Sequence, residues 1–187
     1  MQEYKMNSKK FNTQGFSLFL DRDGVINRRI VDDYVKNISE FEFLPDVKQA
    51  IKLLSSYFEK IFVVTNQQGI GKGLTTEDDL LKVHSFMFDE INKSGGHINK
   101  IYYCPQRQEE GSINRKPNVG MAMQAKGDFP EIKFNNSVMV GDSASDMEFG
   151  RRLGMITVLV GDKEEVEDKL FDLHFNNLKD FANFIKF

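Results

Sequence analysis

Residues 16–24 read Phe-Ser-Leu-Phe-Leu-Asp-Arg-Asp-Gly, and the prediction of the fold starts from them. Its first five residues are mostly apolar, and a short apolar run that stops abruptly is typical of a buried strand. Asp21 and Asp23 follow where the strand leaves the sheet, which is where ligand sites lie in open α/β sheets. Side chains near a strand end alternate in direction, so one carboxylate can act as a nucleophile while the other moves protons. A solvated acidic turn is the alternative until partner residues are found.

A calcium loop is a second alternative, because D-x-D-G can open one. Such a loop needs an oxygen ligand at position 5, glycine at position 6 and glutamate at position 12. Counted from Asp21, those positions hold Val25, Ile26 and Asp32. We therefore reject the calcium loop.

Composition limits the class of protein. The 187 residues are 40% hydrophobic and 28% charged, which indicates a globular chain with a real core. The net charge of −3 argues against a nucleic-acid partner. Cys104 is the single cysteine, which favours a reducing compartment. Residues 1–15 form a polar tail without a signal-peptide pattern, and no apolar run reaches membrane length. We expect a cytoplasmic monomer with no membrane partner and one domain over residues 16–187.

Buried strands and amphipathic helices alternate along the rest of the chain. Apolar runs predict strands over 61–64, 101–103, 138–140 and 156–160. Helices are predicted after Pro45-Asp46, from Thr76, around 121–125 and up to Gly154, with helix, short strand and helix over 164–187. Residues 24–44 lack a helical period and are interpreted as a flap or hairpin, and the glycine loop 69–73 is expected to shape a pocket. The alternation predicts an α/β fold with a mainly parallel sheet.

Polar residues follow three of these strands. They are Asp21 with Asp23, Thr65 with Asn66, and Asp142 with Asp146. Parallel strands bring their carboxyl ends to one edge of a sheet, so these clusters can converge, and Lys116 can arrive from a loop. Several carboxylates with one lysine suit Mg²⁺ and phosphate chemistry, in which a carboxylate nucleophile forms an aspartyl-phosphate.

Taken in order, these motifs resemble those of the haloacid dehalogenase (HAD) superfamily of phosphatases. The closest resemblance is to its capless branch, which contains heptose-bisphosphate and histidinol-phosphate phosphatases. It covers about residues 16–160. It is carried by Asp21-Arg22-Asp23-Gly24, Thr65-Asn66, Lys116, and Gly141-Asp142 with Asp146, and by Ile26-Asn27, Tyr34-Val35, Phe41-Glu42-Phe43, Gln67, Tyr102-Tyr103-Cys104-Pro105 and Arg115-Lys116-Pro117. The resemblance implies a three-layer α/β/α Rossmann-like fold without a large cap domain.

The resemblance also implies roles for two aspartates. Asp21 would attack phosphorus, and its carboxylate would bind Mg²⁺ with that of Asp142 and the backbone carbonyl of Asp23. Asp23 would protonate the leaving oxygen and then activate water, which needs a pKa moved towards neutrality, a shift that the charge of Asp21 favours.

The remaining positions would bind the phosphoryl group or the substrate. Thr65 and Asn66 would donate to the phosphoryl group, and Lys116 would neutralise charge. Asp146 would orient either Lys116 or a metal-bound water. Gln67, Arg115 and Arg28 are substrate-contact candidates, although Arg28 is almost as well explained as an ordinary surface residue.

Two departures from the branch are visible. Its members often carry a zinc loop with Cys-x-His before Cys-x-Cys, but here Gln106, Ser112 and Asn114 replace all ligands except Cys104. One soft ligand cannot close a tetrahedral site, so we predict no zinc and a 104–114 loop held by packing. Heptose phosphatases also have a lysine after the fourth-motif aspartate, where this chain has Ser143.

The leading interpretation is a Mg²⁺-dependent phosphomonoesterase acting on a small phosphorylated metabolite. Heptose 1,7-bisphosphate, histidinol phosphate and other sugar phosphates remain open as substrates. A phospho-receiver module is disfavoured by Asp23, because receivers lack a second aspartate two positions after the phosphorylated one. A non-catalytic HAD-fold binding protein is a further alternative. His84, His97 and His174 lie outside every motif and are interpreted as core or surface residues.

Overall fold

The computed structural model describes residues 13–186, and its centre is a six-stranded sheet in the order β3-β2-β1-β4-β5-β6. Every neighbouring pair is parallel. The strands are β1 (Ser17–Leu20), β2 (Lys60–Asn66), β3 (Lys100–Cys104), β4 (Ser137–Gly141), β5 (Ile156–Val160) and β6 (Leu173–Phe175). The predicted α/β class and parallel sheet are confirmed.

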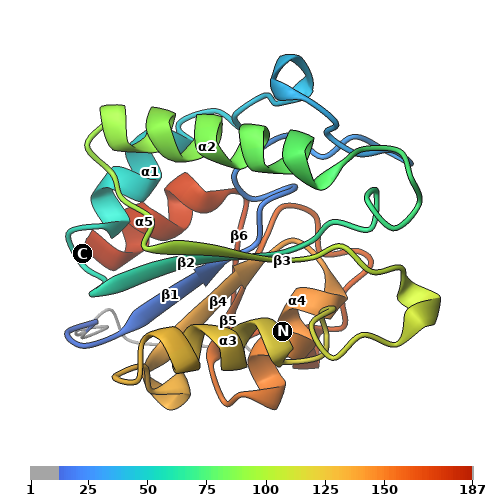
Figure 1. The fold of residues 1–187 in the computed structure, drawn as a ribbon. Helices are drawn as coiled ribbons and strands as arrows, with labels where there is room; N and C mark the ends of the chain where they lie inside the picture. Colours follow the sequence, from blue (N-terminus) through green and yellow to red (C-terminus); the bar gives the residue numbers. More distant parts are fainter. Residues whose placement is uncertain (1–12, 187) are drawn as a thin grey trace.

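Helices cover both faces of this sheet, as Figure 1 shows. One apolar core joins α1, α2 and α5 to the sheet, and a second joins α3 and α4 to its other face. The helices are α1 (Val47–Leu54), α2 (Glu77–Lys93), α3 (Gly120–Asp128), α4 (Ala144–Arg152) and α5 (Leu178–Lys186). This arrangement is the expected three-layer α/β/α fold, and within residues 13–186 no additional domain caps the sheet edge.

The helix-start signals in the sequence are confirmed. Asp46 is the N-cap of α1, and the Thr76 side chain caps α2 by accepting a hydrogen bond from the backbone N–H of Asp79 at 3.1 Å. The apolar stripe that predicted α1 is buried, including Phe58, which lies beyond the last helical residue. An apolar face at helical spacing is what fixes α1 against the sheet.

The strand order changes direction at the sheet centre, where β1 lies between β2 and β4. A crevice therefore opens past the carboxyl ends of β1 and β4, and the backbone N–H of Asp21 bonds to the Val140 carbonyl there at 2.9 Å. Gly24 has a φ of +89°, and a Cβ at this position would lie 1.8 Å from Oδ2 of Asp142. Only glycine therefore allows Asp142 to approach the loop after β1.

Two irregular regions differ in part from expectation. The first helix predicted after residue 164 is only a short 3₁₀ turn at Asp168–Leu170, whereas the strand and helix after it are confirmed. In residues 24–44, isolated bridges link Asn27 to Asp23 and Phe43, and a 3₁₀ turn occupies Ile38–Glu40. The two ends of the segment thus pair antiparallel as in the predicted hairpin, whereas the residues between them form a folded loop.

Residues 1–12 of the expected polar tail lie outside the described residues, while Thr13 is buried. Among the helices that the structure describes, none combines the length and apolar character needed to span a bilayer.

Candidate active site

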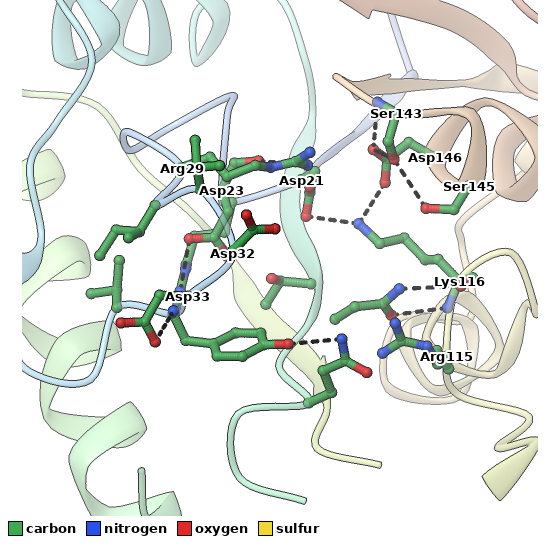
Figure 2. A pocket seen from close by; sticks show the side chains of 18 of the residues that line it. Asp21, Asp23, Arg29, Asp32, Asp33, Arg115, Lys116, Ser143, Ser145 and Asp146 are labelled. Atoms are coloured by element: carbon green, nitrogen blue, oxygen red, sulfur yellow. Dashed lines mark hydrogen bonds and ion pairs between the residues drawn. The ribbon is translucent and has the colours of Figure 1, made fainter. Parts of the chain in front are cut away.

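A cavity of about 840 Å³ opens at the carboxyl edge of the sheet. Its wall is built from the ends of β1 and β2, the loop before α3 and the start of α4, as Figure 2 shows. Asp21, Asp23, Thr65, Asn66, Arg115, Lys116 and Asp146 all line it. The predicted convergence of separate strand ends is therefore present.

Lys116 is the buried electrostatic centre of this cavity. Its Nζ lies 2.7 Å from Oδ1 of Asp21, 2.6 Å from Oδ1 of Asp146 and 2.7 Å from the carbonyl of Val64. Two of the three ammonium donors bond to Asp21 and to the Val64 carbonyl, and the carboxylate of Asp146 lies at ion-pair distance. Lys116 thus acts as a fixed positive charge behind Asp21 and has little freedom to follow a substrate (Figure 2).

Asn66 and Asp146 hold Lys116 in position. The Asn66 side chain accepts from the Lys116 backbone N–H at 3.0 Å and donates to its carbonyl at 3.1 Å. Asp146 accepts at Oδ2 from the Ser143 hydroxyl at 2.6 Å and from the Ser143 backbone at 3.1 Å. The position of Asp146 matches its expected orienting role. Both amide atoms of Asn66 thus contact the Lys116 backbone, while its expected contact with the phosphoryl group stays a prediction.

Asp23 is surrounded by hydrogen-bond donors. Oδ1 accepts from Arg22 and Asn27, each at 2.9 Å, and Oδ2 accepts from Nε2 of Gln67 at 2.8 Å. Burial alone would raise the pKa of Asp23, but the charge of Arg22 and these donors outweigh it and lower the pKa. The expected upward shift is therefore wrong for the substrate-free site, where Asp23 is a carboxylate. Nε2 of Gln67 donates to both Asp23 and the Thr65 hydroxyl, and the expected substrate contact of Gln67 stays a prediction.

Arg22 is supported from behind by His84. The Arg22 side chain is buried, and its Nη1 lies 3.1 Å from Nε2 of His84. Burial, and then the charge of Arg22, lower the pKa of His84 to about 3. The neutral ring can therefore accept from Arg22 at Nε2. His84 is the core histidine that was expected, but it contacts the arginine that fixes Asp23.

Three carboxylates offer a place for a cation. Oxygen atoms of Asp21, Asp142 and Asp146 all lie within 4.8 Å of one another. Burial raises the pKa of Asp21 to about 6 although Lys116 opposes this, and burial with the charges of Asp21 and Asp146 raises that of Asp142 to about 8. A hard divalent cation stabilises crowded buried carboxylates of this kind, because its charge offsets their mutual repulsion.

The two neighbouring arginines of the loop after β1 point to different places. Arg28, the candidate substrate contact, is mostly exposed and pairs with Glu42 at 2.9 Å outside the cavity. Arg29 lines the cavity, and its Nη2 lies 2.6 Å from Oδ1 of Asp142. The sequence could not separate the two, because an irregular loop gives no periodicity from which to read side-chain direction.

A polar cluster at the cavity mouth was also missed. The Tyr34 hydroxyl accepts from Gln68 at 2.8 Å and from Lys72 at 3.0 Å. Lys72 and Gln68 belong to the segment around the glycine loop, which therefore lines the cavity as expected. Lys72 lies among glycines shortly after the polar end of β2, and this pattern is the sequence signal that could have identified the polar cluster.

Comparison with known proteins shows the family to which this chain belongs. A HAD-hydrolase-like family model matches residues 113–179. The D-glycero-alpha-D-manno-heptose-1,7-bisphosphate 7-phosphatase of Campylobacter jejuni is 38% identical over 170 residues, which span 91% of this chain and 95% of that protein. The chain is a HAD-like phosphatase. The resemblance in the sequence is confirmed. The enzyme of the same name from Mycobacterium tuberculosis is 40% identical over 136 residues, 73% of this chain and 72% of that one.

A solved structure supports the same assignment for this HAD-like phosphatase. It is the D,D-heptose 1,7-bisphosphate phosphatase of B. bronchiseptica in complex with magnesium and phosphate. The TM-score is 0.79 with 27% sequence identity, and the match covers 89% of this chain and 96% of that one.

Side-chain hydrogen bonds hold the 104–114 loop of the HAD-like phosphatase. The side-chain carbonyl of Gln106 accepts from the Cys104 thiol at 3.2 Å and from the Ser112 hydroxyl at 3.3 Å. The Asn114 backbone N–H in turn donates to the Ser112 hydroxyl at 3.3 Å. Residues at the four zinc-ligand positions are thus linked by hydrogen bonds, and not by packing alone as expected. The absence of zinc stays a prediction.

Proposed function

We propose that the chain is a Mg²⁺-dependent phosphomonoesterase that removes the 7-phosphate of D-glycero-D-manno-heptose 1,7-bisphosphate through an aspartyl-phosphate on Asp21. The observation that carries the proposal is the buried Asp21–Lys116–Asp146 array beside the Asp23 carboxylate, at the base of an open cavity. The names of the relatives support the substrate.

Asp21 is the nucleophile in this proposal. Its Oδ1 is held by Lys116 at 2.7 Å, which leaves Oδ2 for attack on phosphorus. The P–O bond to the sugar breaks as the bond to Asp21 forms. Lys116 stabilises the negative charge on Asp21 and on the transferring group without moving, and such pre-arranged charge is an effective way to lower a barrier.

Asp23 handles the protons of both half-reactions. It donates one to the leaving sugar oxygen and then takes one from the water that attacks the aspartyl-phosphate, which releases inorganic phosphate. In the substrate-free site the pKa of Asp23 is lowered. The negative charge of a phosphate monoester near Asp23 raises that pKa, so substrate binding itself prepares the acid.

The donor set fits a hard cation. Asp21, Asp142 and the backbone carbonyl of Asp23 are oxygen donors, and Gly24 makes room for the Asp142 carboxylate. These three groups would hold Mg²⁺, which when bound supplies positive charge to the phosphoryl oxygens. Asp146 has one oxygen on Lys116 and the other on Ser143, which places it behind the metal ligands.

The outer cavity suits a sugar with a second phosphate. Lys72 and Arg115 line it, in addition to Lys116 at its base, and either side chain can contact an anion other than the one transferred. Asp32 and Glu165 also line the cavity and can accept hydrogen bonds from sugar hydroxyls. A charge-assisted contact to the second phosphate contributes about 1.5–3 kcal/mol, which favours a bisphosphate over a monophosphate.

Phosphate release from a panel of substrates tests the proposal. We expect Mg²⁺-dependent release from one or both anomers of heptose 1,7-bisphosphate, with a kcat/KM at least about tenfold above that for sugar monophosphates. The product should keep its anomeric phosphate, as ³¹P NMR would show. Preferred hydrolysis of histidinol phosphate would overturn the substrate, and no release from any member would favour a non-catalytic binding protein.

Asp23→Asn should slow both half-reactions by about 10²–10⁴-fold, because positioned acid–base catalysis contributes that much. Rapid-quench measurement of sugar and phosphate release follows the two steps separately. With 4-nitrophenyl phosphate, whose leaving group needs no proton, formation of the aspartyl-phosphate should be impaired much less than its hydrolysis. Equal rates for variant and wild type in both steps would refute the acid–base role.

A further inference from the structure

Arg29 occupies a position that conflicts with a bound metal. Its Nη2 lies 2.6 Å from Oδ1 of Asp142 and 3.5 Å from the backbone carbonyl of Asp23. These are two of the three groups that hold the cation in the proposed function, on which this inference rests. Figure 2 shows the Arg29 side chain extending across the cavity towards Asp21.

The geometry leaves little room for Arg29 and a metal on the same oxygen. Oδ2 of Asp142 packs against Gly24, where a Cβ would lie only 1.8 Å away, so Oδ1 is the less crowded oxygen. A guanidinium has only donors and does not lose its proton in proteins. Arg29 therefore cannot become a metal ligand and has to leave Oδ1 when a cation takes it.

Electrostatic attraction can hold the Arg29 side chain at either of two places, the metal-ligand carboxylates or a bound phosphate. The carboxylates of Asp21, Asp142 and Asp146 face a single ammonium, Lys116, so the metal-free cluster is negative and attracts a further cation. A bound divalent ion removes that excess, and a phosphate monoester then brings new negative charge into the cavity. The Arg29 side chain is half exposed and lines both this cavity and a neighbouring one of about 420 Å³, which gives it room to move.

We propose that Arg29 is an exchangeable counter-ion of the metal site: it holds the metal ligands while the cation is absent, is displaced by the cation, and then binds the anionic substrate. Arg29 is thus both a competitor of the metal and a substrate-binding residue. Its removal should change the two affinities in opposite directions, which a purely structural residue would not do.

Mn²⁺ binding to the substrate-free protein, followed by electron paramagnetic resonance, tests the first half. Arg29→Gln should bind Mn²⁺ about fivefold more tightly than wild type, as expected for loss of a partly exposed ion pair. Arg28→Gln is the matched control, because it removes the same charge from the neighbouring residue, and it should stay within about twofold of wild type. Arg29→Lys should lie between wild type and Arg29→Gln.

Steady-state kinetics at saturating Mg²⁺ tests the second half. Arg29→Gln should raise KM for the phosphorylated substrate about tenfold with little change in kcat, because a charge-assisted contact is lost. Mn²⁺ affinity in Arg29→Gln that equals or falls below wild type, at an unchanged melting temperature, would overturn the exchange. An unchanged KM would overturn the substrate contact. Failure of the wild type to bind Mn²⁺ at all would instead refute the proposed metal dependence.

Discussion

Asp21→Asn should lower turnover by at least about 10⁴-fold, because removal of a covalent nucleophile leaves only binding and electrostatic effects. The amide keeps the shape of the side chain but cannot form the aspartyl-phosphate. Phosphate release under single-turnover conditions measures the effect, and quenching with acid should trap phosphorylated protein from the wild type only.

The same substitution should leave the fold intact. Burial raises the pKa of Asp21 from 3.8 to about 6, so the folded state binds its proton more tightly than the unfolded chain. The metal-free wild type therefore loses stability as the pH rises from 3.8 towards 6, and the neutral amide of the variant does not share this loss. In chelator at neutral pH, the variant should unfold at the same denaturant concentration as wild type or a higher one.

Asp128→Asn serves as the control for the Asp21→Asn variant. Asp128→Asn removes a carboxylate that is bonded to Lys100 and Tyr102 far from the cavity, and it should keep wild-type turnover. If Asp21→Asn kept even a tenth of wild-type turnover, the nucleophile assignment would be wrong.

Lys116→Met should damage activity and stability together. Turnover should fall by about 10³-fold, because a fixed charge that stabilises the transferring group is lost. Stability should fall by about 3–5 kcal/mol, since the buried carboxylates of Asp21 and Asp146 lose their shared partner. Urea unfolding in chelator measures the second effect.

A double variant separates these two effects. Adding Asp146→Asn to Lys116→Met removes one of the unpaired buried charges, so part of the lost stability should return while turnover stays low. Such non-additivity is expected for residues that share one ion-pair network. If the double variant lost the sum of the two single losses, Asp146 would not be acting through Lys116.

The sequence predicted the sheet and the approach of its polar strand ends because both follow from short-range patterns. Apolar runs that end in Asp21 or Asp142 identify strands, and parallel strands end at one edge. It also predicted Asp146 correctly as a neighbour of Lys116. The sheet and the approach of its strand ends needed only order along the chain and the geometry of parallel sheets, whereas the place of Asp146 came from the resemblance to the HAD superfamily.

Side-chain direction and local charge could not be read in the same way. Nothing in the loop after β1 tells Arg28 from Arg29, and the pKa of Asp23 depends on donors from Arg22, Asn27 and Gln67 that meet only in the folded protein. Likewise Asn66 follows the polar pattern of a strand end, but its partner is the backbone of a residue fifty positions away.

The hydrogen-bonded 104–114 loop has a practical consequence for the study of the catalytic metal. Its shape depends on contacts among Cys104, Gln106 and Ser112, which are neutral groups that a chelator does not affect. If Mg²⁺ binds as proposed, a chelator should therefore act on the carboxylate cluster, and the 104–114 loop should keep its shape during metal depletion and reconstitution.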